Sequence, residues 1–334
     1  MIDNARLLKI VDRLPQAKVI LYGDLVLDRF ILGTPKRISR EAPVIILRHE
    51  RQEDVPGGGA NALANLSSLG VSVFPIGAVG DDEPGRALRA ALDKLDIDTS
   101  RIITVPDFKT PTKVRILGGG PTSLKHQVAR YDIEDHLPKT GSWVGRLASH
   151  MAECSGGTGA VAVSDYGYGS VTNEVLKTCR GLQSPDCWIC LDSRYRTGIF
   201  DNIGGATPNL EELEAWAGHR LVGHEQVAEA AEALRQALGA RFVLATRGNQ
   251  GMTLVEIDRE PLHIPVFGTD EVADVTGAGD TVLATLVATL AAGATPAEAA
   301  GLANIAGGLV VMKLGTATVS RQELRRAVLS LEDR

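Results

Sequence analysis

The sequence predicts a doubly wound α/β fold, in which helices flank both faces of a mainly parallel sheet and a small β-sheet forms a lid. Three observations predict it. Short apolar segments alternate with helical patterns along almost the whole chain. These segments are nearly continuously apolar, as strands are when helices cover both faces of a sheet. Two other stretches break the alternation. Ligands of such folds bind at the carboxyl ends of the strands.

The predicted elements follow one another in a regular order. The first residues, MIDNARLLKIVDRL, form an amphipathic helical pattern. We predict strands at 18–22, 72–79, 159–164, 188–192 and 241–246. We predict further helices at 59–69, 84–95, 171–182, 209–217, 225–238, 277–293, 296–313 and 320–331.

The two stretches that break the alternation are residues 28–54 and 101–133. They are rich in Arg, Thr, Ile and Val, and they contain alternating segments such as PVIILRHE and TKVRIL. We expect them to form antiparallel strands of one small sheet, a lid over the strand ends, with GGGPT at 118–122 as a hairpin turn. No repeat or linker marks a second full domain, so we expect one domain over residues 1–334.

Composition excludes several classes of protein. The net charge of -6 argues against a general nucleic-acid surface. The longest apolar runs, such as 282–292, are far shorter than the roughly 20 residues of a membrane span. The N-terminal segment lacks the apolar core of a secretory signal. We therefore expect a cytoplasmic protein that binds neither nucleic acid nor membrane.

The four cysteines do not indicate a metal site. Cys187 and Cys190 form a C-x-x-C pattern inside CWICLD, which is typical of a buried strand. A zinc site needs a second ligand pair at comparable spacing, and Cys154 and Cys179 do not supply one. We expect all four side chains to have a structural role.

The segment DVTGAGD at 274–280 stands where a long helix of small residues begins. Gly277, Ala278 and Gly279 would bare the first N–H groups of that helix, so that an anion could bind at the positive end of the dipole. Asp280 would lie beside the anion as a base. An ordinary turn with an aspartate cap is the alternative.

Two polar motifs lie near the N-terminus. VPGGGANAL at 55–63 places three glycines before a helix and Asn61 in its first turn, so the backbone there could approach a ligand closely. A glycine-rich turn is the alternative. Asp24 and Asp28 follow the first strand, and a pair of carboxylates suits sugar hydroxyl groups. Solvation at the surface is the alternative for that pair.

TPNLEELEAW at 207–216 spaces Asn209 and Glu212 as N-x-x-E. One interpretation is a helix start with acidic residues in its first turn. The other is that both side chains orient the water shell of Mg²⁺ near nucleotide phosphates, since Mg²⁺ keeps several waters and takes few protein oxygens directly.

TRGNQGM at 246–252 directly follows a predicted strand. The backbone at Thr246, Gly248 and Gly251 could hold a nucleotide phosphate, or the segment could be a plain hairpin turn. The sequence contains no Walker A motif, no H-R-D of protein kinases and no dinucleotide fingerprint of the G-x-G-x-x-G form.

In this order, the four motifs resemble those of the ribokinase-like (PfkB) carbohydrate kinases, and the resemblance spans essentially the whole chain. PGGGAN and DVTGAGD as an ordered pair are specific to that family. A finer resemblance is to the D-glycero-β-D-manno-heptose 7-phosphate kinases. It is carried by GDLVLDRFILGTPKRISREAPV (23–44), VGDDEPGRAL (79–88), SDYGYG (164–169) and KLGTATVS (313–320). GGGPTSLKHQVARYD (118–132) differs from the shorter, Gln-rich segment of those kinases.

The resemblance implies an ATP-dependent kinase that phosphorylates the heptose 7-phosphate at its anomeric O1, giving the 1,7-bisphosphate on the route to ADP-heptose and lipopolysaccharide. Alternatives are another PfkB kinase, acting on ribose, fructose or another hexose or sugar phosphate, and a non-catalytic sugar- or nucleotide-binding protein. Because a pure binder needs no base, Asp280 favours the enzyme. No companion nucleotidyltransferase domain follows in the sequence, so we expect a separate protein to act on the product.

The resemblance also implies roles for individual residues. The N–H groups of Ala278, Gly279 and Asp280 would form an anion hole, with Asp280 as general base. The sugar would be held by Asp24, Asp28, Gly58, Gly59, Asn61 and Arg130. The nucleotide would be held by Asn209, Glu212, Thr246, Gly248, Gly251 and Asn304. Further candidates for binding the sugar's phosphate are Lys36, Arg37, Arg194 and Arg196.

Cofactors and partners follow from the same resemblance. ATP would be the co-substrate, and Glu212 would hold Mg²⁺ through water. Asp274 would steady the loop beside a monovalent cation site, where K⁺ could bind. A small sheet is poorly stable alone and leaves exposed edges, so we expect a homodimer with the two lids clasped.

Overall fold

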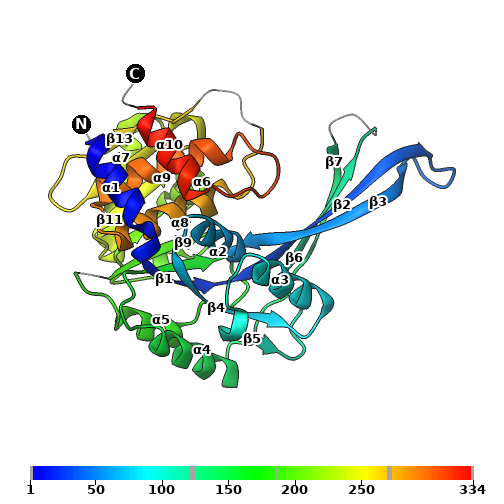
Figure 1. The fold of residues 1–334 in the computed structure, drawn as a ribbon, viewed down its shortest axis with the longest axis horizontal. Coiled ribbons are helices and arrows are strands. Elements are labelled where there is room, and N and C mark those ends of the chain that lie inside the picture. Colours follow the sequence, from blue (N-terminus) through cyan, green and yellow to red (C-terminus); the bar gives the residue numbers. More distant parts are fainter. Residues whose placement is uncertain (1–2, 121–124, 186, 269–272, 332–334) are drawn as a thin grey trace.

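The computed structural model describes residues 3–120, 125–185, 187–268 and 273–331. In this part of the chain, nine strands form a central sheet in the order β13-β12-β11-β10-β9-β8-β1-β4-β5 (Figure 1). Its strands are β1 (Lys18–Gly23), β4 (Ser72–Gly80), β5 (Ile102–Val105), β8 (Ala160–Asp165), β9 (Trp188–Ser193), β10 (Gly205–Ala206), β11 (Phe242–Thr246), β12 (Met252–Glu256) and β13 (Leu262–Ile264). All neighbours from β11 to β5 are parallel, while β12 and β13 pair antiparallel.

Helices cover both faces of this sheet, which confirms the predicted fold class. The helices are α1 (Asn4–Arg13), α2 (Gly59–Ser68), α3 (Glu83–Asp93), α4 (Ser142–Glu153), α5 (Asn173–Arg180), α6 (Leu210–Ala217), α7 (Gly223–Leu238), α8 (Ala278–Ala291), α9 (Pro296–Val310) and α10 (Arg321–Leu329). Alternate residues of β1 enter separate cores: Val19 and Leu21 pack with α1, α2 and α8, whereas Ile20 and Tyr22 pack with α4, α5 and α7.

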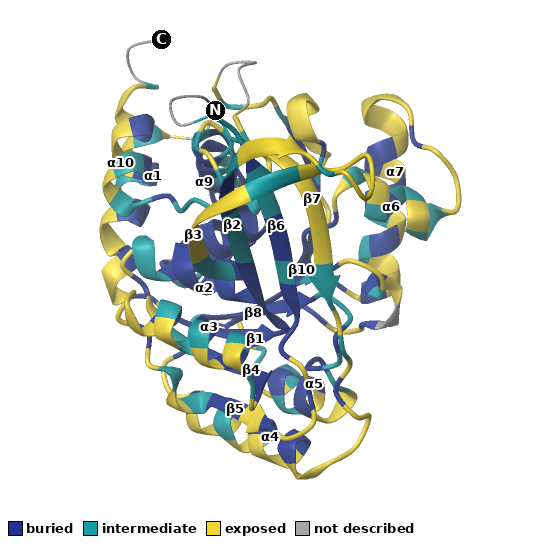
Figure 2. Ribbon diagram, turned by 90° about the vertical axis from the view of Figure 1, so that its right-hand side faces the viewer, coloured by how far each residue is buried: buried dark blue, intermediate teal, exposed yellow. Residues whose placement is uncertain are grey.

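A second, four-stranded sheet projects from the body of the molecule (Figures 1 and 2). Its order is β3-β2-β6-β7, and its strands are β2 (Leu25–Ile38), β3 (Ile45–Gly58), β6 (Thr112–Gly118) and β7 (His126–Ile133). Two of the three strand pairs, β2–β3 and β6–β7, are antiparallel as predicted, but β2 and β6 pair parallel. We call this the small sheet.

The small sheet draws on different residues from those predicted. The prediction of 101–133 begins too early, because β5 pairs with β4 in the central sheet. Ile102 and Ile103 are buried in opposite cores, which is the environment of a central strand. The prediction of 28–54 is too short at both ends, since β2 begins at Leu25 and β3 ends at Gly58. The predicted turn at 118–122 lies partly outside the described residues.

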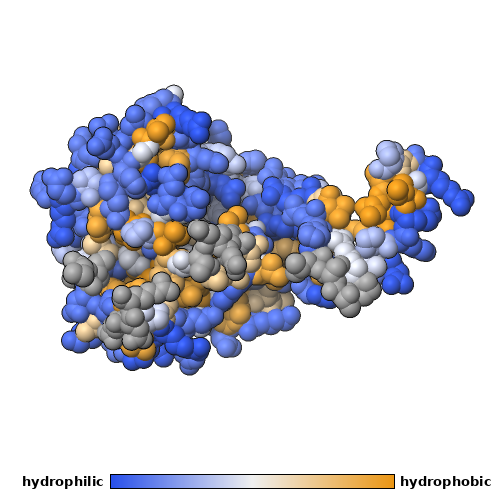
Figure 3. All heavy atoms as spheres, turned by 90° about the horizontal axis from the view of Figure 1, so that it is seen from above, coloured by the Kyte–Doolittle hydropathy of each residue, from blue (hydrophilic) through white to orange (hydrophobic). Residues whose placement is uncertain are grey.

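The outer part of the small sheet carries exposed hydrophobic side chains (Figure 3). They are Ile38, Val44, Ile45, Val128 and Tyr131, each between 44% and 71% exposed. Elsewhere, the predicted strands and helices lie within a few residues of the observed ones. The sequence patterns missed α4, whose buried face is Trp143, Val144, Leu147 and Met151. No helix in the described part of the chain combines the length and apolar character needed to cross a membrane.

Candidate active site

A hollow of about 560 Å³ opens at the carboxyl ends of β9, β10 and β11, beside the start of α8. Its wall comes from the loop after β8, the first turn of α6, the turn after β11 and the first turn of α8. It brings together eight of the predicted site residues: Asn209, Glu212, Thr246, Gly248, Gly277, Ala278, Gly279 and Asp280. The position agrees with the rule that ligands of open α/β sheets bind at strand carboxyl ends.

The first turn of α8 presents unused N–H groups to this hollow. Gly277 caps the helix in the left-handed conformation, with φ at 77°, and a Cβ there would lie 2.4 Å from Nδ2 of Asn61. Only glycine fits this position. The N–H of Ala278 donates to the carbonyl of Val275, contrary to its predicted place in an anion hole. No acceptor in the described part of the chain takes the N–H groups of Gly279 and Asp280, so these two can bind an anion.

Asp280 is buried, and both of its carboxylate oxygens accept hydrogen bonds. The hydroxyl of Tyr166 donates to Oδ1 at 2.8 Å, and Nδ2 of Asn61 donates to Oδ2 at 3.0 Å. Burial raises the pKa of Asp280 to about 6, although the bonds from Asn61 and Tyr166 and the charge of Arg194 oppose that rise. Asp280 is therefore ionised at neutral pH, with a pKa suited to a general base.

Asn61 lies in a network of amides that joins α2 to α8. Nδ2 of Asn65 donates to the backbone carbonyl of Asn61 at 3.0 Å and to its side-chain Oδ1 at 3.3 Å. Oδ1 of Asn65 accepts from the hydroxyl of Thr281 at 3.2 Å. The backbone N–H of Val319 donates to the same oxygen at 3.3 Å. This network fixes the amide of Asn61 against Asp280. The sequence patterns did not single out Asn65.

Packing within the protein accounts for the three glycines at 57–59. A Cβ on Gly57 would lie 2.6 Å from the carboxyl carbon of Asp28, and a Cβ on Gly59 would lie 2.8 Å from the carbonyl of Asp24. Gly58 has φ at 53° and packs close to Tyr166. All three residues are buried. Their contacts hold the start of α2 in place, and their contact with sugar stays a prediction.

Asp24 holds the loop that carries Tyr166. It is 1% exposed. Its two oxygens accept from the backbone N–H groups of Tyr166, Tyr168 and Ser170, at 2.9, 3.0 and 2.9 Å. The prediction that Asp24 binds sugar hydroxyls has no support in this geometry, because the protein backbone occupies the carboxylate. Asp24 instead positions Tyr166 beside Asp280.

Asp28 forms an ion pair within the small sheet. Its Oδ1 lies 2.8 Å from Nη1 of Arg115, and both side chains are buried. Burial raises the pKa of Asp28, while the charges of Arg115, Lys113 and Arg130 oppose the rise. Asp28 therefore stands among three cations at the base of the small sheet.

Lys113, Arg115 and Arg130 lie on the face of the small sheet that carries Lys113 toward Tyr166. In the register of the small sheet, Asp28 lies opposite Lys113, and Arg115 lies opposite Arg130, so all four share one face. Nζ of Lys113 lies 5.1 Å from the ring centroid of Tyr166, over the ring that also contacts Arg194. Arg130 forms a two-pronged pair with Asp132. We call Lys113, Arg115 and Arg130 together the basic face.

The other predicted phosphate partners lie elsewhere. Arg196 pairs with the buried carboxylate of Asp165, which leaves its guanidinium engaged in the protein. Lys36 and Arg37 lie on the outer part of β2, beside the end of the hairpin. Arg194 does line the hollow, with its guanidinium 4.7 Å from the ring centroid of Tyr166.

Asn209 and Glu212 form a capping box at the start of α6. Oδ1 of Asn209 accepts from the N–H of Glu212 at 2.9 Å, and Oε2 of Glu212 accepts from the N–H of Asn209 at 3.0 Å. Both residues also line the hollow, so the two interpretations of N-x-x-E are compatible. Asp192, at the end of β9, lies near Glu212 and Asp280. Burial raises its pKa, and both neighbouring carboxylates raise it further.

TRGNQGM forms the hairpin between the antiparallel strands β11 and β12. Thr246 and Gly248 nevertheless line the hollow. Gly251 does not belong to its lining. A Cβ on Gly251 would lie 2.1 Å from the carbonyl of Ile264, and its φ is 77°, so packing against β13 requires this glycine.

Two predicted residues hold loops in place. Asn304 donates from Nδ2 to the carbonyl of Pro265 at 2.8 Å and is absent from the lining of the hollow, so its predicted nucleotide contact has no support. Asp274 accepts from the N–H groups of Thr276 and Gly315. Burial works against the ionised form of Asp274, but these hydrogen bonds lower its pKa below the ordinary value.

The four cysteines are free and buried. In the described residues, no group of three or more His, Cys, Asp or Glu side chains is arranged to hold a metal ion directly.

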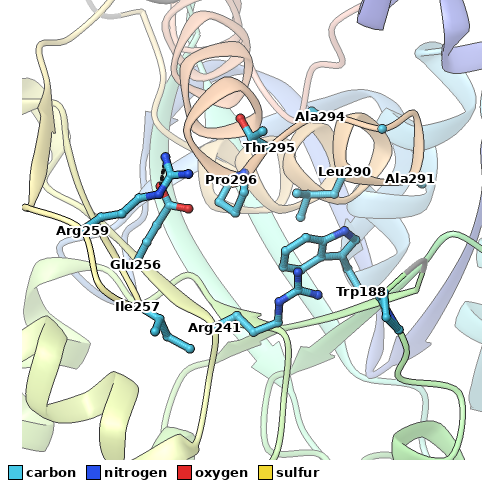
Figure 4. Close-up of a pocket in the computed structure, with 12 residues that line it drawn as sticks. Trp188, Arg241, Glu256, Ile257, Arg259, Leu290, Ala291, Ala294, Thr295 and Pro296 are labelled. Carbon is cyan, nitrogen blue, oxygen red and sulfur yellow. Dashed lines mark ion pairs between the residues drawn. The ribbon is translucent and has the colours of Figure 1, made fainter.

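A second hollow, of about 600 Å³, lies at the opposite ends of the strands (Figure 4). The guanidinium of Arg241 stacks 3.6 Å from the ring centroid of Trp188 in its wall. The start of α9 borders it, but Thr295 and Glu298 close that helix start with a capping box. We therefore place the chemistry in the hollow beside Asp280.

Several residues of this site escaped the sequence patterns. Tyr166 stands directly after a predicted strand, in SDYGYG, and Asp192 closes another. Lys113 and Arg115 occupy alternate positions of TKVRIL. A search for polar side chains at strand ends and on one face of the lid strands could have found all four.

Comparison with known proteins gives a consistent result. Residues 16–323 match the profile described as pfkB family carbohydrate kinase. The chain is 38% identical over 332 residues to the bifunctional protein HldE of Hyphomonas neptunium, covering 97% of this chain and 66% of that protein. It is 39% identical over 319 residues to HldE of Hahella chejuensis, covering 93% of this chain and 63% of that protein. The chain thus spans slightly less than two thirds of these relatives.

Solved structures share the fold at low sequence identity. Arabidopsis thaliana ribokinase, in complex with ribose and ATP, superimposes with a TM-score of 0.72 at 19% identity, covering 93% of this chain and 98% of that one. Phosphofructokinase-2 of Escherichia coli, in complex with substrates and products, gives a TM-score of 0.74 at 20% identity, covering 95% and 99%. The fold is therefore ribokinase-like.

Proposed function

The chain belongs to the pfkB family of carbohydrate kinases, and from this premise we propose that it phosphorylates D-glycero-β-D-manno-heptose 7-phosphate at the anomeric hydroxyl. ATP would be the phosphoryl donor, and the product would be the 1,7-bisphosphate on the route to ADP-heptose and lipopolysaccharide. The resemblance of KLGTATVS (313–320) and the other quoted segments to the D-glycero-β-D-manno-heptose 7-phosphate kinases supports this substrate. The chain is also 38% and 39% identical to the bifunctional proteins HldE of Hyphomonas neptunium and Hahella chejuensis.

One observation carries the proposal: Asp280 stands beside unused helix N–H groups and faces a set of cations. The carboxylate can accept the proton of a sugar hydroxyl. The N–H groups of Gly279 and Asp280 can stabilise negative charge on the phosphoryl group as it transfers. Positioning and charge stabilisation are most of what phosphoryl transfer requires of a protein.

In the proposed mechanism, the protein orients the base and the acceptor before transfer. Tyr166 and Asn61 fix the two oxygens of Asp280, and each oxygen keeps a lone pair for the acceptor hydroxyl. The acceptor oxygen attacks the γ-phosphorus, the bond from that phosphorus to the bridging oxygen breaks, and ADP leaves. The hydroxyl proton passes to Asp280.

Kinases of this type use ATP together with a divalent metal, and we propose Mg²⁺ here. The donor set fits a hydrated ion. Burial and the neighbouring charge of Glu212 raise the pKa of Asp192, so a cation between the two carboxylates would be favoured. Because no direct ligand cluster exists in the described residues, both carboxylates would hold the ion through water. When bound, the ion would neutralise phosphate charge. A K⁺ ion beside the loop of Asp274 is part of the same proposal.

The basic face supports a substrate that already carries a phosphate. Lys113, Arg115 and Arg130 share one side of the small sheet, and Lys113 lies over Tyr166, the partner of the base. Arg115 and Arg130 already pair with Asp28 and Asp132, whereas Lys113 has no ion-pair partner among the described residues. A phosphate dianion would supply a counter-charge for Lys113 and further acceptors for the two guanidinium groups. We propose that this face holds the 7-phosphate, and that Asp28 and Asn61 lie nearer the sugar hydroxyl groups.

We further propose a cytoplasmic homodimer clasped through the small sheets. A cytoplasmic site would give the enzyme access to ATP. The exposed hydrophobic side chains of the small sheet and its open edge strands, β3 and β7, support pairing with a second copy.

A coupled assay of ATP consumption tests the proposed function. We expect the highest kcat/KM with the heptose 7-phosphate among a panel that also holds ribose, fructose and fructose 6-phosphate. A higher value with one of the latter three would favour another PfkB kinase. Sugar binding without ATP consumption across the panel would indicate a binding protein instead.

A further inference from the structure

A buried guanidinium with only neutral partners lies in the wall of the hollow. Arg247 directly follows β11 and is 6% exposed. It lines the hollow between Thr246 and Gly248, on the side assigned to the nucleotide. A buried cation is costly unless an anion or several dipoles compensate it. The groups around Arg247 therefore show whether the protein itself neutralises this buried positive charge.

The described partners of Arg247 are a histidine, an amide and a carbonyl. Its Nη1 lies 2.6 Å from Nδ1 of His224, and its Nη2 donates to Oε1 of Gln250 at 2.6 Å. The carbonyl of Gly223 accepts from Nη2 at a longer 3.5 Å. Nε is buried and has no partner in the described part of the chain. None of these groups carries a negative charge, so the protein leaves the charge of Arg247 unneutralised.

These contacts join two segments that border the hollow. Gln250 belongs to the turn between β11 and β12, while Gly223 and His224 begin α7. The N–H of Thr246 also donates to the carbonyl of Pro208, just before α6. Arg247 is thus held in the wall by the turn on one side and by α7 on the other.

The contact with His224 requires a neutral imidazole. A guanidinium only donates, so Nδ1 of His224 must lack a proton to accept from it. The ring of His224 lies 4.5 Å from that of His263 on β13, centroid to centroid, and Nδ1 of His263 lies 3.1 Å from the hydroxyl of Thr253 on β12. Burial lowers the pKa of His263, as do His224 and Arg247. Both histidines are exposed to solvent.

We propose that Arg247 binds the anionic part of the nucleotide, whose phosphate oxygens supply the counter-charge that the protein lacks. The inference rests on the proposed function, because it requires a nucleotide in the hollow.

Calorimetric titration with ADP and with adenosine tests this proposal. Arg247→Gln should weaken ADP binding by roughly tenfold, the range of a hydrogen bond to a charged group, and leave adenosine binding within a factor of about two. Arg247→Met also removes the charge and provides the same comparison if the glutamine variant does not fold. Equal weakening of both ligands would overturn the proposal, because a distorted turn affects both. If the unaltered protein binds neither ligand, the proposed function fails as well.

Discussion

The hydroxyl of Tyr166 donates a hydrogen bond to Oδ1 of Asp280 across 2.8 Å, and so joins the loop after β8 to the first turn of α8. Asp24 holds that loop through three backbone N–H groups. The proposed base and its hydrogen-bond donor therefore come from two segments, more than 100 residues apart in sequence, that meet at the carboxyl edge of the sheet. This relationship has a consequence for the pH dependence of the enzyme.

Tyr166→Phe should move the acidic limb of the pH profile upward. The pKa of Asp280 is about 6, and the bond from Tyr166 lowers it from a higher value. Activity needs the ionised carboxylate, so it falls as the pH drops through this pKa. Without the hydroxyl, the pKa rises, and activity at pH 6 should fall more than activity at pH 8. A pH profile of kcat/KM for the sugar measures the shift.

Tyr168→Phe is the matched control for that experiment. Tyr168 lies two residues further along the same loop, but its hydroxyl donates to Glu134. The acidic limb of the pH profile of Tyr168→Phe should coincide with that of the unaltered enzyme. If the acidic limb of Tyr166→Phe also coincides with it, the hydrogen bond from Tyr166 does not set the pKa of Asp280.

Asp280→Asn should abolish most of the turnover while leaving the protein folded. Loss of a general base typically costs about 10²- to 10⁴-fold in rate. The pKa of Asp280 is raised in the folded state. The protonated carboxyl therefore stabilises the fold at pH values below the unfolded pKa, and this contribution is lost as the pH rises through about 6. At pH 8 the amide therefore removes no charge-dependent stability, although it provides one acceptor fewer to Tyr166 and Asn61.

For Asp280→Asn, we expect a melting temperature at pH 8 within a few degrees of the unaltered protein, about the effect of 1 kcal/mol or less. ADP should still bind. Turnover close to normal, measured with the heptose 7-phosphate, would remove Asp280 from the role of base.

Glu212→Gln should raise the Mg²⁺ concentration needed for half-maximal activity. A carboxylate that orders the hydration shell would be neutralised. Glutamine can still complete the capping box with Asn209, so stability should change little. This separates the two interpretations of N-x-x-E, since the structure shows the capping box and is compatible with a metal role as well. Activity measured against Mg²⁺ concentration gives the answer.

The matched control is Glu323→Gln, in the equivalent capping box of α10 with Ser320. That helix start does not line the hollow. Its metal dependence should equal that of the unaltered enzyme. If Glu212→Gln behaves like this control, Glu212 is a helix cap alone.

Lys113→Gln and Arg130→Gln should each raise KM for the heptose 7-phosphate by roughly tenfold, the range of a lost charged hydrogen bond. KM for ATP should stay nearly constant, because the basic face lies on the small sheet rather than beside the nucleotide. The unphosphorylated heptose provides the internal comparison, since its KM should not change. Lys36→Gln, on the outer part of β2, is the control. Equal losses with both sugars would place the phosphate elsewhere.

Sequence patterns predicted five of the nine described strands of the central sheet, namely β1, β4, β8, β9 and β11, and missed β10, β12 and β13. The strand segments are apolar on both faces, which distinguishes them from most other structure. β5 was assigned to the lid, although Ile102 and Ile103 enter opposite cores. Periodicity in four residues does not reveal which sheet a strand joins, since pairing with β4 depends on contacts distant in sequence.

The site was predictable where a motif is local and not where it is assembled. DVTGAGD located Asp280 and the helix start from consecutive residues. Tyr166 and Lys113 lie near the start of α8 but belong to other elements, so no single segment of the sequence shows that these residues meet. Conversely, Asp24 and Asn304 are polar residues with suggestive positions, but backbone groups occupy both side chains. Only the three-dimensional structure shows such occupancy.

The exposed hydrophobic side chains of the small sheet lead to the last prediction, which concerns assembly. Ile38 and Val44 are 71% and 56% exposed near the end of the β2–β3 hairpin, and Val128 on β7 is 48% exposed. Pairing with a second copy would remove this apolar surface from water. Light scattering at micromolar concentration should therefore give the mass of a dimer, and Val44→Asp combined with Val128→Asp should shift it toward a monomer. A double substitution at exposed, polar positions of α7, Glu225→Gln with Glu229→Gln, should leave the dimer intact. A monomer mass for the unaltered chain would contradict the clasp. A dimer that survives both aspartates would place the interface on another surface.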